Sequence, residues 1–265
     1  MGTSSGYTPA GGPQWGAAKG DAANAVNPQK SGSEKLPQAL QSHLAARLGG
    51  TGQTSGGGGV SGAAGTHGGG GGRRSAGGGT AFRVARATAQ GLGQFISEVQ
   101  TDGLREALVS RGLDSLADRP LQEVIQGIVS TLTERTGYIE EADALTAAGK
   151  VLDDLRTGCD TLDEFEQRLD KLTDSARMSC LLSEFFRHVL VEDFMRHYWR
   201  HLQEKCSNGR LEELRKQLDD LLFEKLQFDL DYGELGEVEW SSDEAQALIE
   251  RVERETFELC CEVVS

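Results

Sequence analysis

The sequence predicts an all-α protein, with a bundle of about seven helices over residues 81–265 after a long disordered Gly-rich tail over residues 1–80. Three observations lead to this prediction. The tail holds 24 of the 35 glycines. Beyond residue 80, apolar residues recur every three or four positions, which is helical spacing. No segment shows the sustained alternation of apolar and polar residues that indicates a strand.

The two segments also differ in charge. Residues 1–80 carry six Lys/Arg against two Asp/Glu, a net charge of +4, whereas residues 81–265 carry 21 Lys/Arg against 39 Asp/Glu, a net charge of −18. Because an acidic surface repels a phosphate backbone, we do not expect the body to contact nucleic acid directly. The absence of a long apolar run and of a secretory signal, together with five cysteines, an odd number, indicates a cytoplasmic protein without membrane contact.

Helix signals follow one another along the body. Two of the predicted helices open with a capping box, at Thr161–Glu164 and at Ser241–Glu244. Asp102 is expected to cap a short helix, and Asp118 and Pro120 to open the next one. Gly91 and Gly93 weaken the middle of the first helix. The apolar spacing places seven helices, of which the first, at residues 82–100, has a short second piece at 104–108. The others lie at residues 120–132, 142–155, 162–172, 175–206, 210–228 and 243–264.

One short helix is expected inside the tail, at residues 36–48. Its leucines recur every four residues, Pro37 suits a first helical turn and Gly49 suits the end of a helix. Thirteen residues are marginal for a free helix, so the leucine stripe needs a surface to bind. The stripe could dock on a partner protein, or it could pack on the chain's own body. Its members are Leu36, Leu40, Leu44 and Leu48.

No pattern of catalytic residues is present. The sequence lacks a nucleophile elbow, a P-loop and a dinucleotide-binding fingerprint, so we expect neither an enzyme nor a cofactor. His197 and His201 are four residues apart and could hold zinc on one helix face, but neighbouring arginines would repel a cation and no metal site is predicted. The preferred interpretation of this stretch is a basic, aromatic face that meets an acidic surface.

The extreme N-terminus offers a different chemistry. Gly2 is small enough for Met1 to be removed, which would expose a glycine α-amine with a reference pKa of roughly 8. Such an amine is partly neutral at pH 7 and is the most available amine nucleophile on the chain. Position 6 is Gly6 rather than Ser or Thr, so the start does not match a myristoylation signal.

Several short motifs resemble the B component of Qat bacterial anti-phage systems. They are the MGTSS start at residues 1–5, Gly11-Gly12-Pro13 with Trp15, the Gly-rich stretch that ends in arginines, the first helix at residues 82–95, and the DRPLQEVI helix opening at residues 118–125. The resemblance implies operon partners: an ATPase, a QueC-like enzyme and a TatD-like nuclease. QueC-type enzymes activate a 7-deazaguanine carboxylate as an adenylate and deliver an amine to it.

The resemblance leads to a hypothesis in which Gly2 replaces ammonia as the acceptor amine. Thr3, Ser4 and Ser5 would be recognised with it, being small enough to follow Gly2 into a narrow pocket, while the body or the leucine stripe holds the ATPase. Two alternatives stay open. The protein could be an unmodified helical adaptor, or a nucleic-acid-binding accessory protein that uses Arg73-Arg74 and the face from Arg187 to Arg200.

Overall fold

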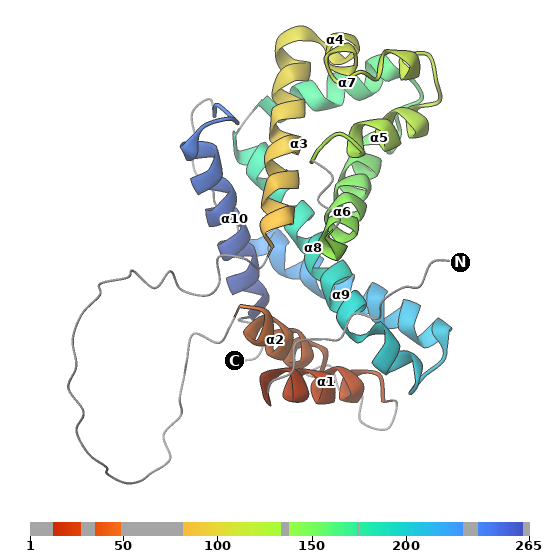
Figure 1. The fold of residues 1–265 in the computed structure, drawn as a ribbon, viewed down its shortest axis with the longest axis vertical. Coiled ribbons are helices and arrows are strands. Elements are labelled where there is room, and N and C mark those ends of the chain that lie inside the picture. The colour runs from red at the N-terminus through yellow and green to blue at the C-terminus, as the bar shows by residue number, and fades with distance from the viewer. Residues whose placement is uncertain are drawn as a thin grey trace, which may run out of the picture.

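A computed structural model of the chain describes residues 13–27, 35–48, 82–133, 138–173, 175–229 and 238–261 (Figure 1). Within these ranges the chain forms α-helices and two short 3-10 turns and no strand, which confirms the all-α prediction. The described residues hold ten α-helices: two lie within residues 1–80, where one was expected, and eight lie beyond residue 80, where about seven were expected. These are α1 (Pro13–Ala25), α2 (Lys35–Arg47), α3 (Arg83–Asp102), α4 (Leu104–Ser110), α5 (Leu121–Val129), α6 (Ile139–Arg156), α7 (Leu162–Asp170), α8 (Ser175–Gln203), α9 (Asn208–Asp229) and α10 (Asp243–Cys261).

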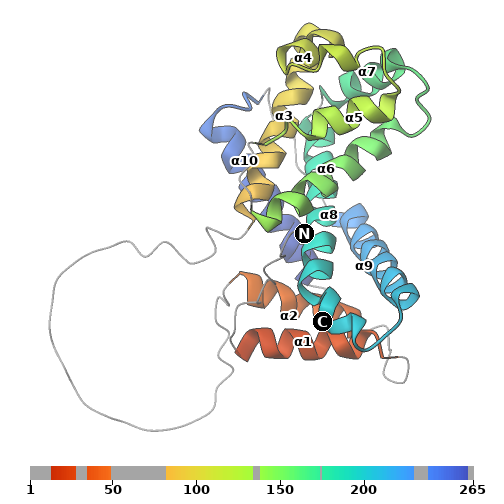
Figure 2. The same cartoon turned by 45° about the vertical axis from the view of Figure 1, so that its right-hand side comes forward.

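The longest helix, α8, is the central element of the fold. Its 29 residues span about 43 Å, and it contacts α1, α3, α6, α9 and α10. Figure 2 shows α9 running beside it. A helix surrounded in this way buries apolar side chains on several faces rather than along one stripe. The side chains that α8 places in the core include Leu182, Phe185, Phe186, Leu190, Phe194 and Tyr198, all fully buried.

The two glycines of α3 have a packing role that the sequence did not reveal. A methyl group built on Gly91 would overlap the backbone carbonyl of Leu132, and one built on Gly93 would overlap the indole ring of Trp240. The low helix propensity of glycine is therefore offset by a close approach that no larger residue allows. The same closeness brings the side-chain amide of Gln90 to the carbonyl of Trp240, at 2.9 Å.

Three of the predicted helix starts can be compared with the structure. The Thr161 capping box is confirmed, since the Thr161 hydroxyl accepts a hydrogen bond from the Glu164 amide at 3.2 Å. The second predicted capping box, at Ser241–Glu244, is wrong in detail. Ser242, rather than Ser241, caps α10, and its hydroxyl accepts a hydrogen bond from the Ala245 amide at 3.2 Å. The prediction for Asp102 is also wrong, because that residue ends α3 and Gly103, at φ 89°, separates α3 from α4.

The tail contains two helices where the sequence predicted one. The expected helix at residues 36–48 is present as α2, but α1 was not expected, because its Gly- and Ala-rich sequence has no leucine stripe. Small side chains let α1 lie close to α2, and Ala18 and Ala22 are fully buried there. We call α1 and α2 the N-terminal helix pair, and α3 to α10 the helical body. Both figures show the pair beside one end of α8.

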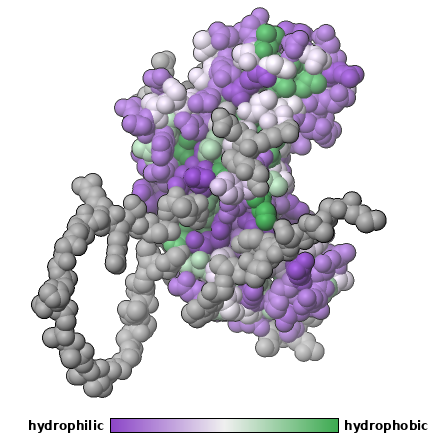
Figure 3. Space-filling view, viewed as in Figure 1, coloured by the Kyte–Doolittle hydropathy of each residue, from purple (hydrophilic) through white to green (hydrophobic). Residues whose placement is uncertain are grey.

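The visible surface of the body is largely hydrophilic. Figure 3 shows hydrophobic residues gathered mainly at the end of the molecule where α4 and α5 lie. In this region Val109 of α4 is 61% exposed. Of the described helices, none combines the length and the hydropathy that a membrane crossing requires.

Candidate functional site

A cluster of buried polar side chains lies where the N-terminal helix pair meets α8. Asp193 of α8 is at its centre and is 1% exposed. His43 of α2 donates from Nε2 to Asp193 Oδ2 at 2.9 Å, and Arg47 of α2 forms an ion pair with the same oxygen, with Nε at 3.0 Å. Arg196 of α8 pairs with the other carboxylate oxygen. One carboxylate on α8 thus binds two side chains of α2.

The hydrogen bonds place one proton on each histidine ring. A carboxylate can only accept, so Nε2 of His43 carries a proton, and Nδ1 is hydrogen-bonded to the Tyr198 hydroxyl at 3.1 Å. His197 donates from Nδ1 to the backbone carbonyl of Asp193 at 2.7 Å. Trp15 of α1 stacks on the His197 ring, with centroids 5.0 Å apart and planes 15° apart. We call this group the Asp193 cluster: Trp15, His43, Arg47, Asp193, Arg196, His197 and Tyr198.

Burial and neighbouring charges shift the pKa values of His197 and Asp193 in opposite directions. Burial lowers the pKa of His197 to about 4, against the opposing pull of the Asp193 carboxylate, so the ring is neutral at pH 7. Burial alone would raise the pKa of Asp193, but the hydrogen bond from His43 and the positive charge of Arg47 hold it well below its ordinary value. Asp193 is therefore an anion that its neighbours fully bind.

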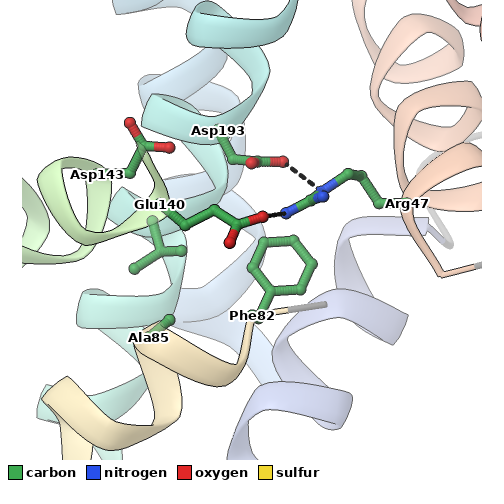
Figure 4. A pocket seen from close by; sticks show the side chains of 7 residues that line it. Arg47, Phe82, Ala85, Glu140, Asp143 and Asp193 are labelled. Carbon is green, nitrogen blue, oxygen red and sulfur yellow. Dashed lines mark hydrogen bonds and ion pairs between the residues drawn. The ribbon is translucent and has the colours of Figure 1, made fainter. Parts of the chain in front are cut away.

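A second layer of carboxylates joins the cluster to α6. Arg47 donates to Glu140 at 3.2 Å, and Arg196 pairs with Asp143. Burial raises the pKa of Asp143 to about 6, although Arg196 opposes this shift. The first residue of the body, Phe82, lies under the Arg47 guanidinium, 4.9 Å from its ring centroid. Figure 4 shows Arg47 reaching both Asp193 and Glu140 across a small cavity.

Three residues of the cluster have the composition of a metal site. Ligand atoms of His43, Asp193 and His197 lie within 4.8 Å of one another. A cation would nevertheless have to compete with two guanidinium groups that already pair with the Asp193 carboxylate. These residues therefore fit a hydrogen-bonded junction better than a metal centre. His201, paired with His197 in the sequence-based zinc alternative, is not among the three.

The leucine stripe predicted for partner docking is covered within the chain. Leu40 and Leu44 are fully buried, and Leu36 and Leu48 are partly buried against the core. The docking of this stripe on a partner stays a prediction. Gly2, Thr3, Ser4 and Ser5, the predicted acceptor and recognition residues, lie outside the described residues.

The basic face expected on α8 is directed inwards. Arg187 pairs with Glu184 and with Asp219 of α9, and Arg196 pairs with Asp143 and Asp193. This matches the expectation of a basic face that meets an acidic surface. Arg200, at the other end of the face, is exposed, and Arg73 and Arg74 lie outside the described residues, so the nucleic-acid alternative stays a prediction.

Sequence reasoning missed His43, Asp193 and Trp15 as a group. One signal was available for His43, which lies on the leucine face of its helix and is 0% exposed. A polar residue on an apolar face needs a buried partner. The identity of that partner, 150 residues away, could not be read from local patterns.

The family comparison covers the body. A model of the family described as Qat anti-phage system associated protein QatB matches residues 70–260, which include α3 to α9 and nearly all of α10. Neither the curated proteins nor the solved structures contain a significant match. The match spans well over half of the chain, and the chain therefore belongs to the QatB family of Qat anti-phage systems.

Proposed function

We propose that this protein is a non-enzymatic component of a Qat system, in which Gly2 is the acceptor for a QueC-like enzyme and the helical body docks on the partner ATPase. Three observations support the non-enzymatic part. The Asp193 cluster is buried, its carboxylate is bound by three neighbouring side chains, and it includes no serine, threonine or cysteine to act as a nucleophile. The cluster holds two segments of the chain together and has no room for a substrate.

The position of α1 supports the proposal that Gly2 is the acceptor. Its first residue is Pro13, and its buried alanines fix it to α2 and α8. Gly2 is therefore eleven residues from an anchored point. At 3.3–3.6 Å per residue, an extended chain of this length reaches roughly 36–40 Å. This is enough to enter a partner's active site while the body stays bound elsewhere.

The proposed reaction is an acyl transfer. The neutral amine of Gly2 attacks the carbonyl carbon of the 7-deazaguanine acyl adenylate that the QueC-like enzyme makes from ATP. An amide C–N bond forms, the C–O bond to AMP breaks, AMP leaves with the electron pair, and the amine nitrogen gives up a proton. This chemistry needs an unhindered amine close to its reference pKa of roughly 8.

Substitution at Gly2 tests the proposal in cells. We expect Gly2→Pro to abolish protection from phage, because the pyrrolidine ring adds bulk at the nitrogen and at Cα in a pocket that would accept glycine. Gly6→Pro is the matched control, since it places the same residue in the same segment without changing the amine, and it should protect like the wild type. Full protection by the Gly2→Pro protein would contradict the acceptor role and leave the unmodified adaptor. That alternative also predicts that deletion of residues 1–6 is harmless.

A further inference from the structure

We propose that a cationic surface at the end of α8, close to the start of α1, docks on an acidic patch of the QueC-like enzyme. The surface consists of Lys19 of α1, Arg200 and His201 of α8, and Lys205, which follows α8. Arg200 and Lys205 are exposed, and Lys19 and His201 are partly exposed. The inference rests on the proposed acceptor role of Gly2 and adds the place at which the modifying enzyme is held.

The register of α1 on α8 brings these charges together. Trp15 of α1 stacks on His197 of α8, with ring centroids 5.0 Å apart. Lys19 and His201 each come four residues later, and residues four apart share one face of a helix. The two helices therefore meet in two successive contacts. The first is aromatic, and the second places a lysine beside a histidine within the range of their charges.

The charges of this surface are not balanced within the part of the chain that the structure describes. There, no acidic side chain forms an ion pair with Lys19, Arg200 or Lys205. Burial lowers the pKa of His201, and the charges of Lys205 and Lys19 lower it further, against the pull of Glu204. The cations thus repel one another, and an anionic surface brought against them would offset this repulsion.

The surface also departs from the charge of the body. Residues 196–210 carry four Lys/Arg against one Asp/Glu, whereas residues 81–265 carry 21 against 39. The negative end of the helix macrodipole accounts for Arg200 and His201 in the last turn of α8. It does not account for Lys19, which belongs to another helix. A small cationic surface on an acidic body fits an acidic patch of a protein better than a nucleic acid, whose phosphates would meet the surrounding carboxylates.

The position of the surface relative to Gly2 points to the modifying enzyme as the partner. Lys19 is six residues beyond Pro13, which is about 9 Å along α1. Gly2 is eleven residues before Pro13, so it lies within roughly 36–40 Å of the start of α1 by any path. The other end of α8, beside α7, is about 43 Å away along that helix (Figure 1). An enzyme held at the cationic surface is therefore held at the end of the molecule where Gly2 is attached.

Binding of the purified QueC-like enzyme to the full-length protein, measured by biolayer interferometry, tests the proposal. We expect Lys19→Glu, Arg200→Glu and Lys205→Glu, combined in one protein, to weaken binding by roughly tenfold or more, because like charges would then face each other. Wild-type binding should weaken as salt is raised from about 50 to about 300 mM, and binding of the triple variant should depend on salt much less. Arg200→Gln with Lys205→Gln changes only exposed side chains and should cause a smaller loss, which guards against a folding defect.

The matched control is Lys171→Glu, which makes the same charge reversal at an exposed lysine in the turn before the other end of α8. It should bind the enzyme as the wild type does. The proposal would be overturned if the wild type did not bind the enzyme, if the triple variant bound as well as the wild type, or if Lys171→Glu weakened binding equally. Loss of DNA or RNA binding in the triple variant, with enzyme binding intact, would assign the surface to nucleic acid instead.

The intact masses of the same proteins, purified from cells that express the whole gene neighbourhood, separate this proposal from the acceptor role. An unmodified wild type whose enzyme binding depends on the cationic surface would contradict only the acceptor role of Gly2. A triple variant that is fully modified and binds fully would contradict only the docking surface.

Discussion

The N-terminal helix pair and the helical body are both α-helical, but different forces hold them. The body buries large side chains such as Phe165, Phe185 and Phe186 in a continuous core around α8. The pair buries mainly alanines and two leucines, and polar groups that meet at Asp193 fix it to the body. The match to the QatB family begins at residue 70, after the pair has ended. The family match is thus carried by the body, and the pair lies before the matched residues.

The largest effect is expected when a fully buried side chain in each region is truncated to alanine and the free energies of unfolding are compared. Phe186→Ala should lower the free energy of unfolding of the body by about 3–5 kcal/mol, because it removes an aromatic ring from the core and leaves a cavity. Leu44→Ala, equally buried, should lower it by about 1 kcal/mol or less, because we expect the smaller helix pair to unfold before the body does. Urea denaturation followed by circular dichroism measures both. Equal losses would show that the pair and the body are one cooperative unit.

The next effect concerns pH at the interface. Because the pKa of His197 is lowered to about 4, the contribution of this ring to the free energy of unfolding is present above pH 6.5 and is lost as pH falls towards 4. Because the pKa of Asp143 is raised to about 6, its contribution has the opposite sign, being present below pH 3.8 and lost as pH rises through 6. Each shift corresponds to roughly 3 kcal/mol, so the two nearly cancel between pH 4 and 6.5.

Two substitutions separate these opposing contributions. Asp143→Asn removes the group whose contribution to stability is present at low pH. The stability of this variant relative to the wild type should therefore fall by roughly 3 kcal/mol as the pH is lowered from 6.5 to 4. His197→Gln should show the reverse trend and gain on the wild type as pH falls. Urea denaturation at several pH values gives both curves. Parallel curves for all three proteins would contradict the assigned shifts.

The smallest effect concerns glycines within the body. Gly91→Ala should destabilise it by roughly 1–3 kcal/mol, because the added methyl group meets the Leu132 carbonyl, which is backbone and cannot turn away. Gly149→Ala in α6 is the matched control, with only Val129 at 4.0 Å from the added carbon. It should be neutral or stabilising by up to about 1 kcal/mol. Thermal melting compares the two. If Gly149→Ala lost as much stability as Gly91→Ala, crowding at Leu132 would not be the cause of the effect.

The contrast between the regions also explains what the sequence could predict. Helices of the body were found because leucine and phenylalanine recur at helical spacing, as in α8 and α9, and because Thr161 forms a capping box. Helix α1 was missed because its alanines and glycines carry no periodic signal and its helical form depends on contact with α2. The Asp193 cluster was missed because His43 and Asp193 are 150 residues apart and each looks ordinary alone.

We propose that this member of the QatB family is the protein substrate of a QueC-like enzyme. The most direct test is the intact mass of the protein purified from cells that express its whole native gene neighbourhood, with tandem mass spectrometry to locate any adduct. We predict a mass that lacks Met1 and carries a 7-deazaguanine acyl adduct on Gly2, absent when the QueC-like gene is deleted. An unmodified mass from cells that resist phage would contradict the claim.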